Sequence, residues 1–342
     1  MTIVLISVVV VVNVVVVVVV VVSGGGGGGG RCAPCHVACR CACSPQGISE
    51  VLPVVLRKSE AGRTTFQVRA NGLLDSLATV LQQEMVKFNR LLNRVTSSLA
   101  NLARAIQGLV VMSAELDKMY TAMLNNQVPS LWAAVAYPSL KPLASWVKDL
   151  TSRVQFMRRW LTHGQPKAFP LPVFFFPQGF MTGALQVHSR KTKIAVDTLV
   201  FRTAVRDFSE DECKEGPENG VYVYGAFLEG ARWDRERHVV TEMVPGTLFS
   251  YLPVIWLDPL IKSEYNPQSV YRCPFYKTSR RAGTLSTTGH STNFIVKLDL
   301  PSEHDEDHWI RRGVALLSML VGSLALFFQK VSATIVGSVC RR

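Results

Sequence analysis

Between Leu74 and Met123 the apolar residues recur at alternating steps of three and four positions, which places them along one face of a helix. Gly108 marks a break, so the pattern predicts two packed helices rather than one long rod. Polar and proline residues at 125–129 end the second helix. The apolar face is expected to form core, with a coiled-coil partner as the alternative. Its members are Leu74, Leu77, Leu81, Met85, Phe88, Leu92, Val95, Leu99, Leu102, Ile106, Leu109, Met112, Leu116, Met119 and Met123.

A third helix is predicted to follow Ser139, whose hydroxyl can cap it, and to end at Gly164. Prolines between residues 166 and 177 then favour an extended crossing, and residues 178–191 predict a short helix. The apolar face of the third helix consists of Leu143, Trp146, Val147, Leu150, Val154, Met157 and Leu161.

From Ile194 onward the apolar period changes to two, which is typical of half-buried strands. A polar loop at 207–220 separates the first strand from strand-like segments at 221–234 and 253–257. Residues 271–301 alternate apolar and polar side chains at both ends and are rich in Gly, Ser and Thr between them. They predict two strands joined by an ordered connection.

The fold class that follows is α+β. A helical bundle layer comes first, then a small antiparallel β-barrel-like sheet, and a closing helix begins at His308 and continues to Leu317. We divide the protein into a leader with a cysteine-rich segment and linker, a helical part, a β-rich part and an apolar, basic tail. These parts span residues 1–70, 71–193, 194–320 and 321–342.

The first 22 residues are almost entirely valine, and residues 24–30 are glycine. About 20 apolar residues suffice to span a bilayer. The segment nevertheless lacks the basic n-region and cleavage site of a secretory signal, so we favour a low-complexity leader. The alternative is a membrane-anchored protein with a basic cytosolic interaction domain, in which Arg31 and Arg40 follow the positive-inside tendency.

Five of the eight cysteines crowd into residues 32–43, beside His36. Cys32 and Cys35 have a spacing found in zinc sites, but a second pair on a separate knuckle is missing. We therefore assign no metal, and a zinc-binding adaptor stays an alternative. The remaining cysteines are far apart, which fits a reducing compartment.

The formal net charge is +12, from 37 Lys and Arg against 25 Asp and Glu. The basic residues are scattered in pairs without a long basic run, which indicates a solvated surface. A nucleic-acid partner is not expected.

No phosphate-binding loop of the form G-x-x-x-x-G-K-[ST] occurs, so this chain alone is not expected to hydrolyse ATP. Ser286, His290 and Asp299 have the residue types of a hydrolase triad, but no nucleophile elbow surrounds the serine. We therefore assign no catalytic and no cofactor-binding residue.

Two further groups have structural roles in this interpretation. Glu229, Arg232 and Asp234 are expected to form an ion-pair group at a strand end, and Trp233 and Trp309 are expected to be packing anchors.

Several segments between residues 72 and 320 closely resemble the C-terminal domain of dynein heavy chains, most strongly RAGTLSTTGHSTN at 281–293. The others are VVMS at 110–113, YPSLKPL at 137–143, FFFPQ at 174–178, VYVYGAFLEGARWD at 221–234, CPFYKT at 273–278 and HWIRRGVALL at 308–317. Both flanks depart from the family pattern.

The resemblance implies a non-catalytic structural and regulatory domain of a minus-end-directed microtubule motor, closest to the axonemal heavy chains that drive ciliary beating. Its implied partners are the AAA ring of the parent heavy chain and the intermediate, light intermediate and light chains, with microtubules reached only through the parent motor. The implied location is the cytoplasm, the cytoskeleton and the ciliary axoneme. The sequence would then be a fragment of a motor or a truncated gene model, with ATPase activity belonging to the parent.

Overall fold

The computed structural model describes residues 4–11, 14–21, 45–68, 72–281 and 293–320, and the protein divides into two compact units, Met1–Cys41 and Ala42–Arg342. In the first unit, β1 (Val4–Val11) and β2 (Val14–Val21) pair as antiparallel strands. The described residues of the valine-rich segment are therefore extended, as expected because β-branched side chains favour strands. Among the described residues, no helix combines the length and apolarity that crossing a membrane requires.

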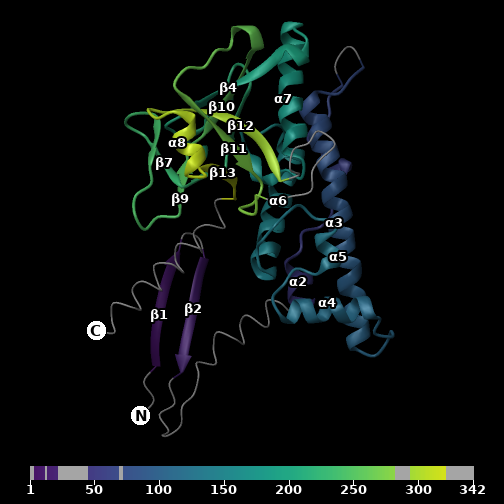
Figure 1. Cartoon of the computed structure of the whole chain (residues 1–342). Coiled ribbons are helices and arrows are strands. Elements are labelled where there is room, and N and C mark those ends of the chain that lie inside the picture. The colour runs from purple at the N-terminus through teal and green to yellow at the C-terminus, as the bar shows by residue number, and fades with distance from the viewer. Residues whose placement is uncertain (1–3, 12–13, 22–44, 69–71, 282–292, 321–342) are drawn as a thin grey trace, which may run out of the picture. The chain divides into compact units, whose positions relative to one another are not determined.

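The second unit opens with a helical layer, in which α3 (Ser76–Ile106) and α4 (Ala114–Leu124) are the first long elements (Figure 1). The side chains of Asp75 and Ser113 accept hydrogen bonds from the first turns of α3 and α4. Between the helices Gly108 has a φ of 73°, a left-handed conformation that glycine adopts without steric cost. The predicted break at Gly108 is confirmed.

Most of the predicted apolar face is buried, but Ile106, Leu109 and Met112 are exposed. Their assignment to the core is wrong, because α3 ends at Ile106 and no described element covers the connection that follows. The short helix α5 (Ser130–Ala133) brings Trp132 into the core. The buried members are Leu77, Leu81, Met85, Phe88, Leu92, Val95, Leu99, Leu102, Met119 and Met123.

The third predicted helix is α6 (Leu143–His163), which ends at Gly164 as expected. Ser139 does not cap it. Pro142 occupies the N-cap position, and the Ser139 hydroxyl accepts a hydrogen bond from a backbone N–H two residues later, which forms a local turn. The short helix predicted next is confirmed as α7 (Pro177–Thr192).

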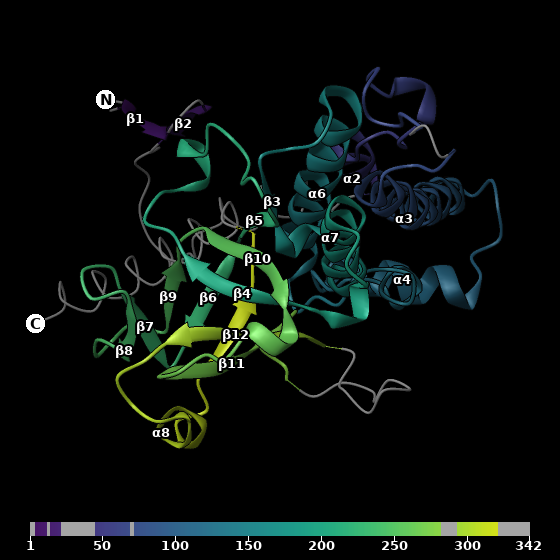
Figure 2. The same cartoon turned by 90° about the horizontal axis from the view of Figure 1, so that it is seen from above.

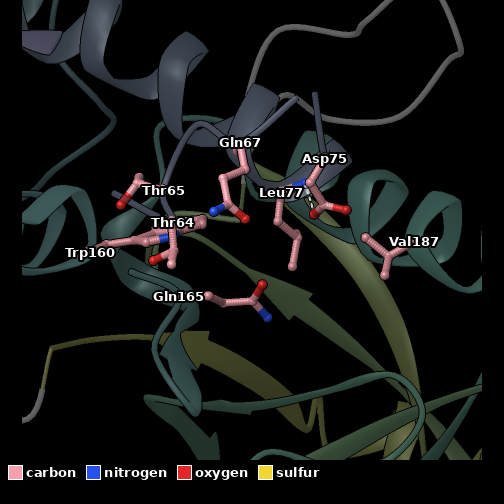
Figure 3. A pocket seen from close by; sticks show the side chains of 9 residues that line it. Thr64, Thr65, Gln67, Asp75, Leu77, Trp160, Gln165 and Val187 are labelled. Atoms are coloured by element: carbon pink, nitrogen blue, oxygen red, sulfur yellow. Dashed lines mark hydrogen bonds between the residues drawn. The ribbon is translucent and has the colours of Figure 1, made fainter. Parts of the chain in front are cut away.

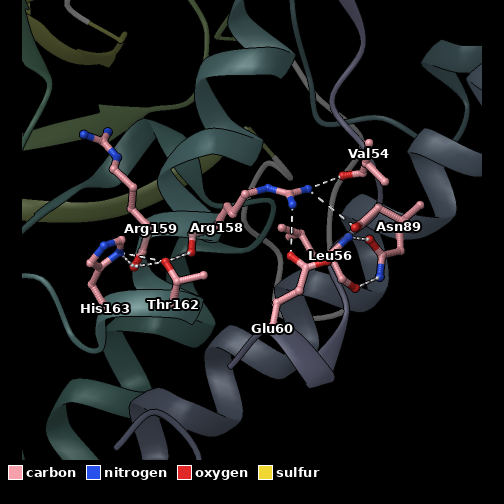
Figure 4. A network of polar contacts seen from close by, with 9 residues as sticks. Val54, Leu56, Glu60, Asn89, Arg158, Arg159, Thr162 and His163 are labelled. Carbon is pink, nitrogen blue, oxygen red and sulfur yellow. Dashed lines mark hydrogen bonds and ion pairs between the residues drawn. The ribbon is translucent and has the colours of Figure 1, made fainter. Parts of the chain in front are cut away.

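Residues 45–68, interpreted above as linker, pack on the helical layer (Figure 4). They include α2 (Pro45–Val51) and the buried side chain of Leu56. The side-chain amide of Asn89 on α3 pairs with both the N–H and the carbonyl of Leu56, at 2.8 and 2.7 Å. Arg158 on α6 binds a carboxylate and backbone carbonyls of the same segment. The linker interpretation is therefore wrong for these residues.

Four strands form one sheet in the order β3, β5, β10, β4. The strand predicted to start at Ile194 starts at Leu199, because Val196–Thr198 forms a 3-10 turn. The predicted polar loop at 207–220 lies between β4 and β5. The strands are β3 (Ala168–Pro170), β4 (Leu199–Val205), β5 (Val221–Tyr224) and β10 (Ile255–Ile261).

Five strands form a second sheet in the order β12, β11, β13, β6, β9. The hairpin predicted for residues 271–301 is confirmed by the antiparallel pairing of β11 with β12. A separate pair, β7 with β8, lies beside this sheet. The strands are β6 (Ala226–Glu229), β7 (Ala231–Asp234), β8 (Val239–Glu242), β9 (Phe249–Leu252), β11 (Val270–Tyr276), β12 (Phe294–Pro301) and β13 (Ala315–Ser318).

Both sheets are open and mixed over the described strands. β3 pairs with β5 in parallel, and β11 pairs with β13 in parallel. The α+β class is therefore confirmed, whereas the antiparallel, barrel-like sheet is not.

The closing helix is shorter than predicted. α8 (Glu306–Arg311) ends at Arg311, two residues before Gly313, which has a φ of 65°, and residues 315–317, predicted as helix, enter β13. β13 lies in the middle of the five-stranded sheet, where a strand is buried on both faces and reads as a continuous apolar run. Such a short run does not distinguish helix from strand by its period.

α7 joins the helical layer to the sheets, because it packs against α3 on one side and against β4 and β12 on the other (Figure 2). The side-chain amide of Gln178 donates to the carbonyl of Phe294 at 2.6 Å across this contact. The helices and the sheets therefore form one packed body.

Candidate interaction surface

Ser286 and His290 lie outside the described residues, as does the cysteine-rich segment at 32–43. Asp299 on β12 accepts a hydrogen bond from the hydroxyl of Tyr265 at 2.7 Å. Burial, together with this hydrogen bond, raises the pKa of Tyr265 above its usual value. The assignment of no catalytic residue stays a prediction.

The ion-pair group predicted at a strand end is only partly present. Arg232 Nη2 and Asp234 Oδ2 lie 3.9 Å apart, but the Glu229 carboxylate instead forms an ion pair with Arg281, with 2.6 Å between Oε2 and Nη2. Glu229 ends β6 and points toward the segment that leaves β11, a neighbour that the sequence does not reveal.

Trp233 and Trp309 are buried, with 6 % and 0 % of their surfaces exposed, so their role as packing anchors is confirmed. The indole N–H of Trp309 donates to the hydroxyl of Ser302 at 2.7 Å.

A cavity of about 360 Å³ lies where residues 64–67 meet α3, α6 and α7 (Figure 3). Asp75 is the charged residue among the described lining residues, and its carboxylate already accepts a hydrogen bond from the N–H of Leu77 at 3.2 Å. Phosphate recognition needs converging N–H groups or cations. The described lining offers neither in a convergent set, so we assign no chemistry to this cavity.

A buried charge cluster joins α6 to the segments on either side of it. Asp149 is 1 % exposed and accepts hydrogen bonds from Lys141 Nζ at 2.5 Å and Arg153 Nε at 2.6 Å. Arg153 also donates to the carbonyl of Pro172 and lies over the ring of Tyr137, 3.7 Å from its centroid. The cluster fixes the turn before α6, the helix itself and the crossing that follows in one geometry.

Burial acts to raise the pKa of Asp149, but attraction to Arg153 and Lys141 outweighs it and holds the pKa of this carboxyl below its ordinary value. Burial lowers the pKa of Lys141. The two shifts therefore disagree about this ion pair, because the lowered pKa of Asp149 favours its charged form whereas the lowered pKa of Lys141 favours its neutral form. Arginine stays protonated in proteins, so Arg153 is the cation that keeps Asp149 ionised. The sequence does not reveal the cluster, because an Asp and an Arg one helical turn apart are equally typical of an exposed face.

A second buried group holds α7 against α3. The Glu84 side chain is 2 % exposed, and its carboxylate accepts hydrogen bonds from the backbone N–H groups of Phe175 and Phe176 at 2.7 and 3.1 Å. Burial raises the pKa of Glu84 despite these hydrogen bonds and the nearby Lys87. Lys277, which follows the end of β11, interacts electrostatically with Glu84 and Lys87, and burial lowers its pKa. α3 therefore fixes the start of the helix that contacts the sheets.

The surface that stands out on this body is the α3–α4 tip, which we define as residues 106–112. Its apolar side chains face solvent, including Leu109 at 67 % and Val111 at 87 % exposure. The tip contains no ionisable side chain, although charged residues flank it on both sides. Its apolar members are Ile106, Leu109, Val110, Val111 and Met112.

The arrangement offers shape and apolar area rather than reactive groups. Exposed apolar patches on an otherwise packed domain mark contacts with other proteins, and interface centres are depleted of charge. The tip has both properties, so it is the best candidate on the described surface for a binding site. The signal was present in the sequence as a short apolar stretch beside Gly108, but periodicity alone assigned it to the core.

Residues 46–318 match the sequence profile of the C-terminal domain of dynein heavy chains, so the similarity begins further upstream than residue 72. The protein is 48% identical over 246 residues to dynein axonemal heavy chain 1 of Rattus norvegicus, a match that covers 72% of this chain and 5% of that protein. It is 45% identical over 290 residues to dynein axonemal heavy chain 6 of Homo sapiens, with 79% and 7% covered. It is 44% identical over 261 residues to dynein axonemal heavy chain 12 of Rattus norvegicus, with 76% and 8% covered. Each match thus spans less than a tenth of the length of the relative.

Proposed function

Because the protein belongs to the family defined by the C-terminal domain of dynein heavy chains, we propose that it is the structural and regulatory C-terminal domain of an axonemal-type heavy chain. In this proposal it has no catalytic activity of its own and braces the AAA ring of the parent motor. The parent motor is minus-end directed, moves on microtubules and acts in the ciliary axoneme, where intermediate, light intermediate and light chains assemble with it.

The observation that supports the bracing role is the combination of a stiff body with an apolar tip. The buried carboxylates of Asp149 and Glu84 tie α3, α6 and the start of α7 together, and α7 packs on the sheets. A force applied at the tip is therefore carried through packed elements to the sheets. We propose that the tip inserts into an apolar groove of the AAA ring.

A role without catalysis is consistent with what the ionisable groups do. The buried carboxylates accept hydrogen bonds from fixed partners, and no phosphate-binding loop occurs in the sequence. The purified full-length protein is expected to show no ATP turnover above that of a mock purification. ATP hydrolysis that co-purifies with the protein through successive columns would contradict this part of the proposal.

The tip can be tested by binding the full-length protein to a recombinant axonemal heavy chain that ends after its AAA ring. Leu109→Ser together with Val111→Ser removes two apolar anchors. Burying one such side chain contributes about 1.5–3 kcal/mol, so losing both is expected to weaken binding by at least ~100-fold.

Leu248→Ser together with Val244→Ser is the matched control, because these residues are 62% and 49% exposed on the segment before β9. The control variant is expected to bind as tightly as the unmodified protein. Equal loss in both variants, or loss in neither, would refute the assignment of the tip as the ring contact.

A further inference from the structure

Three metal-binding side chains converge at one edge of the β-rich part, away from the tip. Glu242 ends β8, and His304 and His308 flank the start of α8. One ligand atom from each of the three side chains lies within 4.8 Å of the other two. The closest pair, His308 Nε2 and Glu242 Oε1, is 2.9 Å apart.

The two imidazoles pack on a buried neighbour, Trp309. Their rings stack with centroids 4.1 Å apart, and both rest on Trp309, with centroid distances of 5.6 and 4.7 Å. The hydroxyl of Ser302 accepts hydrogen bonds from the Trp309 indole N–H and from the backbone N–H of His304, and it donates to the backbone carbonyl of His304. Because Trp309 is fully buried, the histidines have a rigid support.

β8 is positioned relative to these histidines by the backbone. An isolated bridge pairs Val240 with Ser302, two residues away from Glu242 and from His304. This bridge ties the backbone beside Glu242 to the backbone beside His304, and so keeps the Glu242 side chain near the histidines.

Two imidazoles and one carboxylate are a ligand set that zinc takes in proteins, with bonds of about 2.0–2.2 Å and a fourth position left to water. Ligand atoms around such an ion lie about 3.3 Å apart. The observed spacing of up to 4.8 Å has to close by at most about 1.5 Å, and because the two stacked imidazole planes lie only 16° from parallel, one ring has to rotate about its Cβ–Cγ bond before both nitrogen lone pairs point at one ion. Imidazole also suits copper and nickel, and two histidines with one carboxylate also hold non-haem iron(II). Zinc is the ion for which two histidines, a carboxylate and a water complete a tetrahedral set.

We propose that Glu242, His304 and His308 form a Zn²⁺ site that clamps β8 to α8. Ion binding at His308 Nε2 moves the ring proton to Nδ1, so Arg312 Nη1, now 3.2 Å from Nδ1, turns away. The Arg312 side chain is 46 % exposed and also contacts Glu242 Oε1, at 3.2 Å, so this rearrangement exchanges one exposed contact for metal bonds.

The test measures zinc bound to the metal-free full-length protein by equilibrium dialysis and elemental analysis. The unmodified protein is expected to bind one more zinc ion than His304→Asn/His308→Asn. The control is His163→Asn/His238→Asn, which removes two exposed histidines elsewhere, and Asn suits the φ of 55° at His238. Zinc held by the cysteines of residues 32–43 is common to all variants and cancels in the comparison.

Glu242→Gln keeps the side-chain volume, removes the charge and leaves the fold intact because residue 242 is exposed. Removing a residue that only hydrogen-bonds to a metal ligand lowers metal affinity about 10–100-fold. Replacing Glu242, which would itself bind the ion, is therefore expected to weaken zinc binding at least ~10-fold. Saturating zinc is also expected to slow amide hydrogen exchange in residues 239–242 and 304–311 of the unmodified protein and not of the histidine variant. Equal zinc content in the two proteins, or unchanged exchange at saturation, would overturn the proposal.

Discussion

The substitution Asp149→Ala tests whether the buried charge cluster stiffens the helical layer. Asp149 is 1 % exposed and Arg153 10 %, so the variant leaves a guanidinium buried without its counter-charge. Removing one partner of a buried ion pair costs about 3–5 kcal/mol. Lys141 is 25 % exposed and can reach water, so we expect a loss near the lower end, about 3 kcal/mol.

Urea unfolding followed by far-UV circular dichroism and tryptophan fluorescence measures this loss, because Trp132, Trp146 and Trp160 all lie in the helical core. With a denaturant dependence of about 3 kcal/mol per molar urea, the midpoint is expected to fall by ~1 M. A midpoint within ~0.2 M of the unmodified protein, with an unchanged slope, would refute the reasoning.

A triple variant separates buried charge from lost packing. Lys141→Met, Asp149→Leu and Arg153→Met replace the whole cluster by apolar side chains, a change that is often neutral for buried ion pairs. The triple variant is expected to be more stable than Asp149→Ala. If it were less stable, the hydrogen bonds of the cluster would matter more than its uncompensated charge.

Two further predictions concern pH and backbone conformation. Because burial raises the pKa of Glu84, its contribution to the free energy of unfolding is fully present below the usual value of 4.5 and is lost as pH rises through the folded value. The stability advantage of the unmodified protein over Glu84→Gln is therefore expected to shrink with rising pH in urea titrations above pH 4.5, and a growing advantage would contradict the sign of the shift. Gly220 has a φ of 74°, and a Cβ there would meet the carbonyl oxygen of Leu257, so Gly220→Ala is expected to cost more than ~2 kcal/mol in thermal unfolding. Gly246→Ala is the control, since its φ is 85° but a Cβ would meet no described atom within 4 Å; equal losses in the two variants would show that the close approach at Gly220 is unimportant.

The helical layer was predictable because its information is local. The steps of three and four from Leu77 to Leu102 put one face of α3 in the core. Gly108 and Gly164 follow the ends of α3 and α6, and both have positive φ values that glycine adopts without steric cost. The alternation around the 271–301 connection likewise predicted two strands that pair as expected.

Other features depended on neighbours distant in the sequence. Val314 to Leu317 form an apolar run that fits a helix as well as a strand, and only its place between β11 and β6 makes it a strand. Leu56 looked like linker because its partner, Asn89, lies 33 residues away on another element. Glu242 and His308, 66 residues apart, show no spacing that indicates a shared ion.

The sequence by itself determined the long helices and the 271–301 hairpin, though not α2 or β13, and its motifs determined the family, because both kinds of information lie in residues close to one another in the sequence. Tertiary structure alone decided that the sheets are open and mixed, that Ile106 to Met112 face solvent, and that Glu84 and Asp149 are buried. The physical reason is that periodicity reports which face of an element is apolar. What covers that face is decided by packing between elements, and the charge that a buried group can keep depends on the partners that packing supplies.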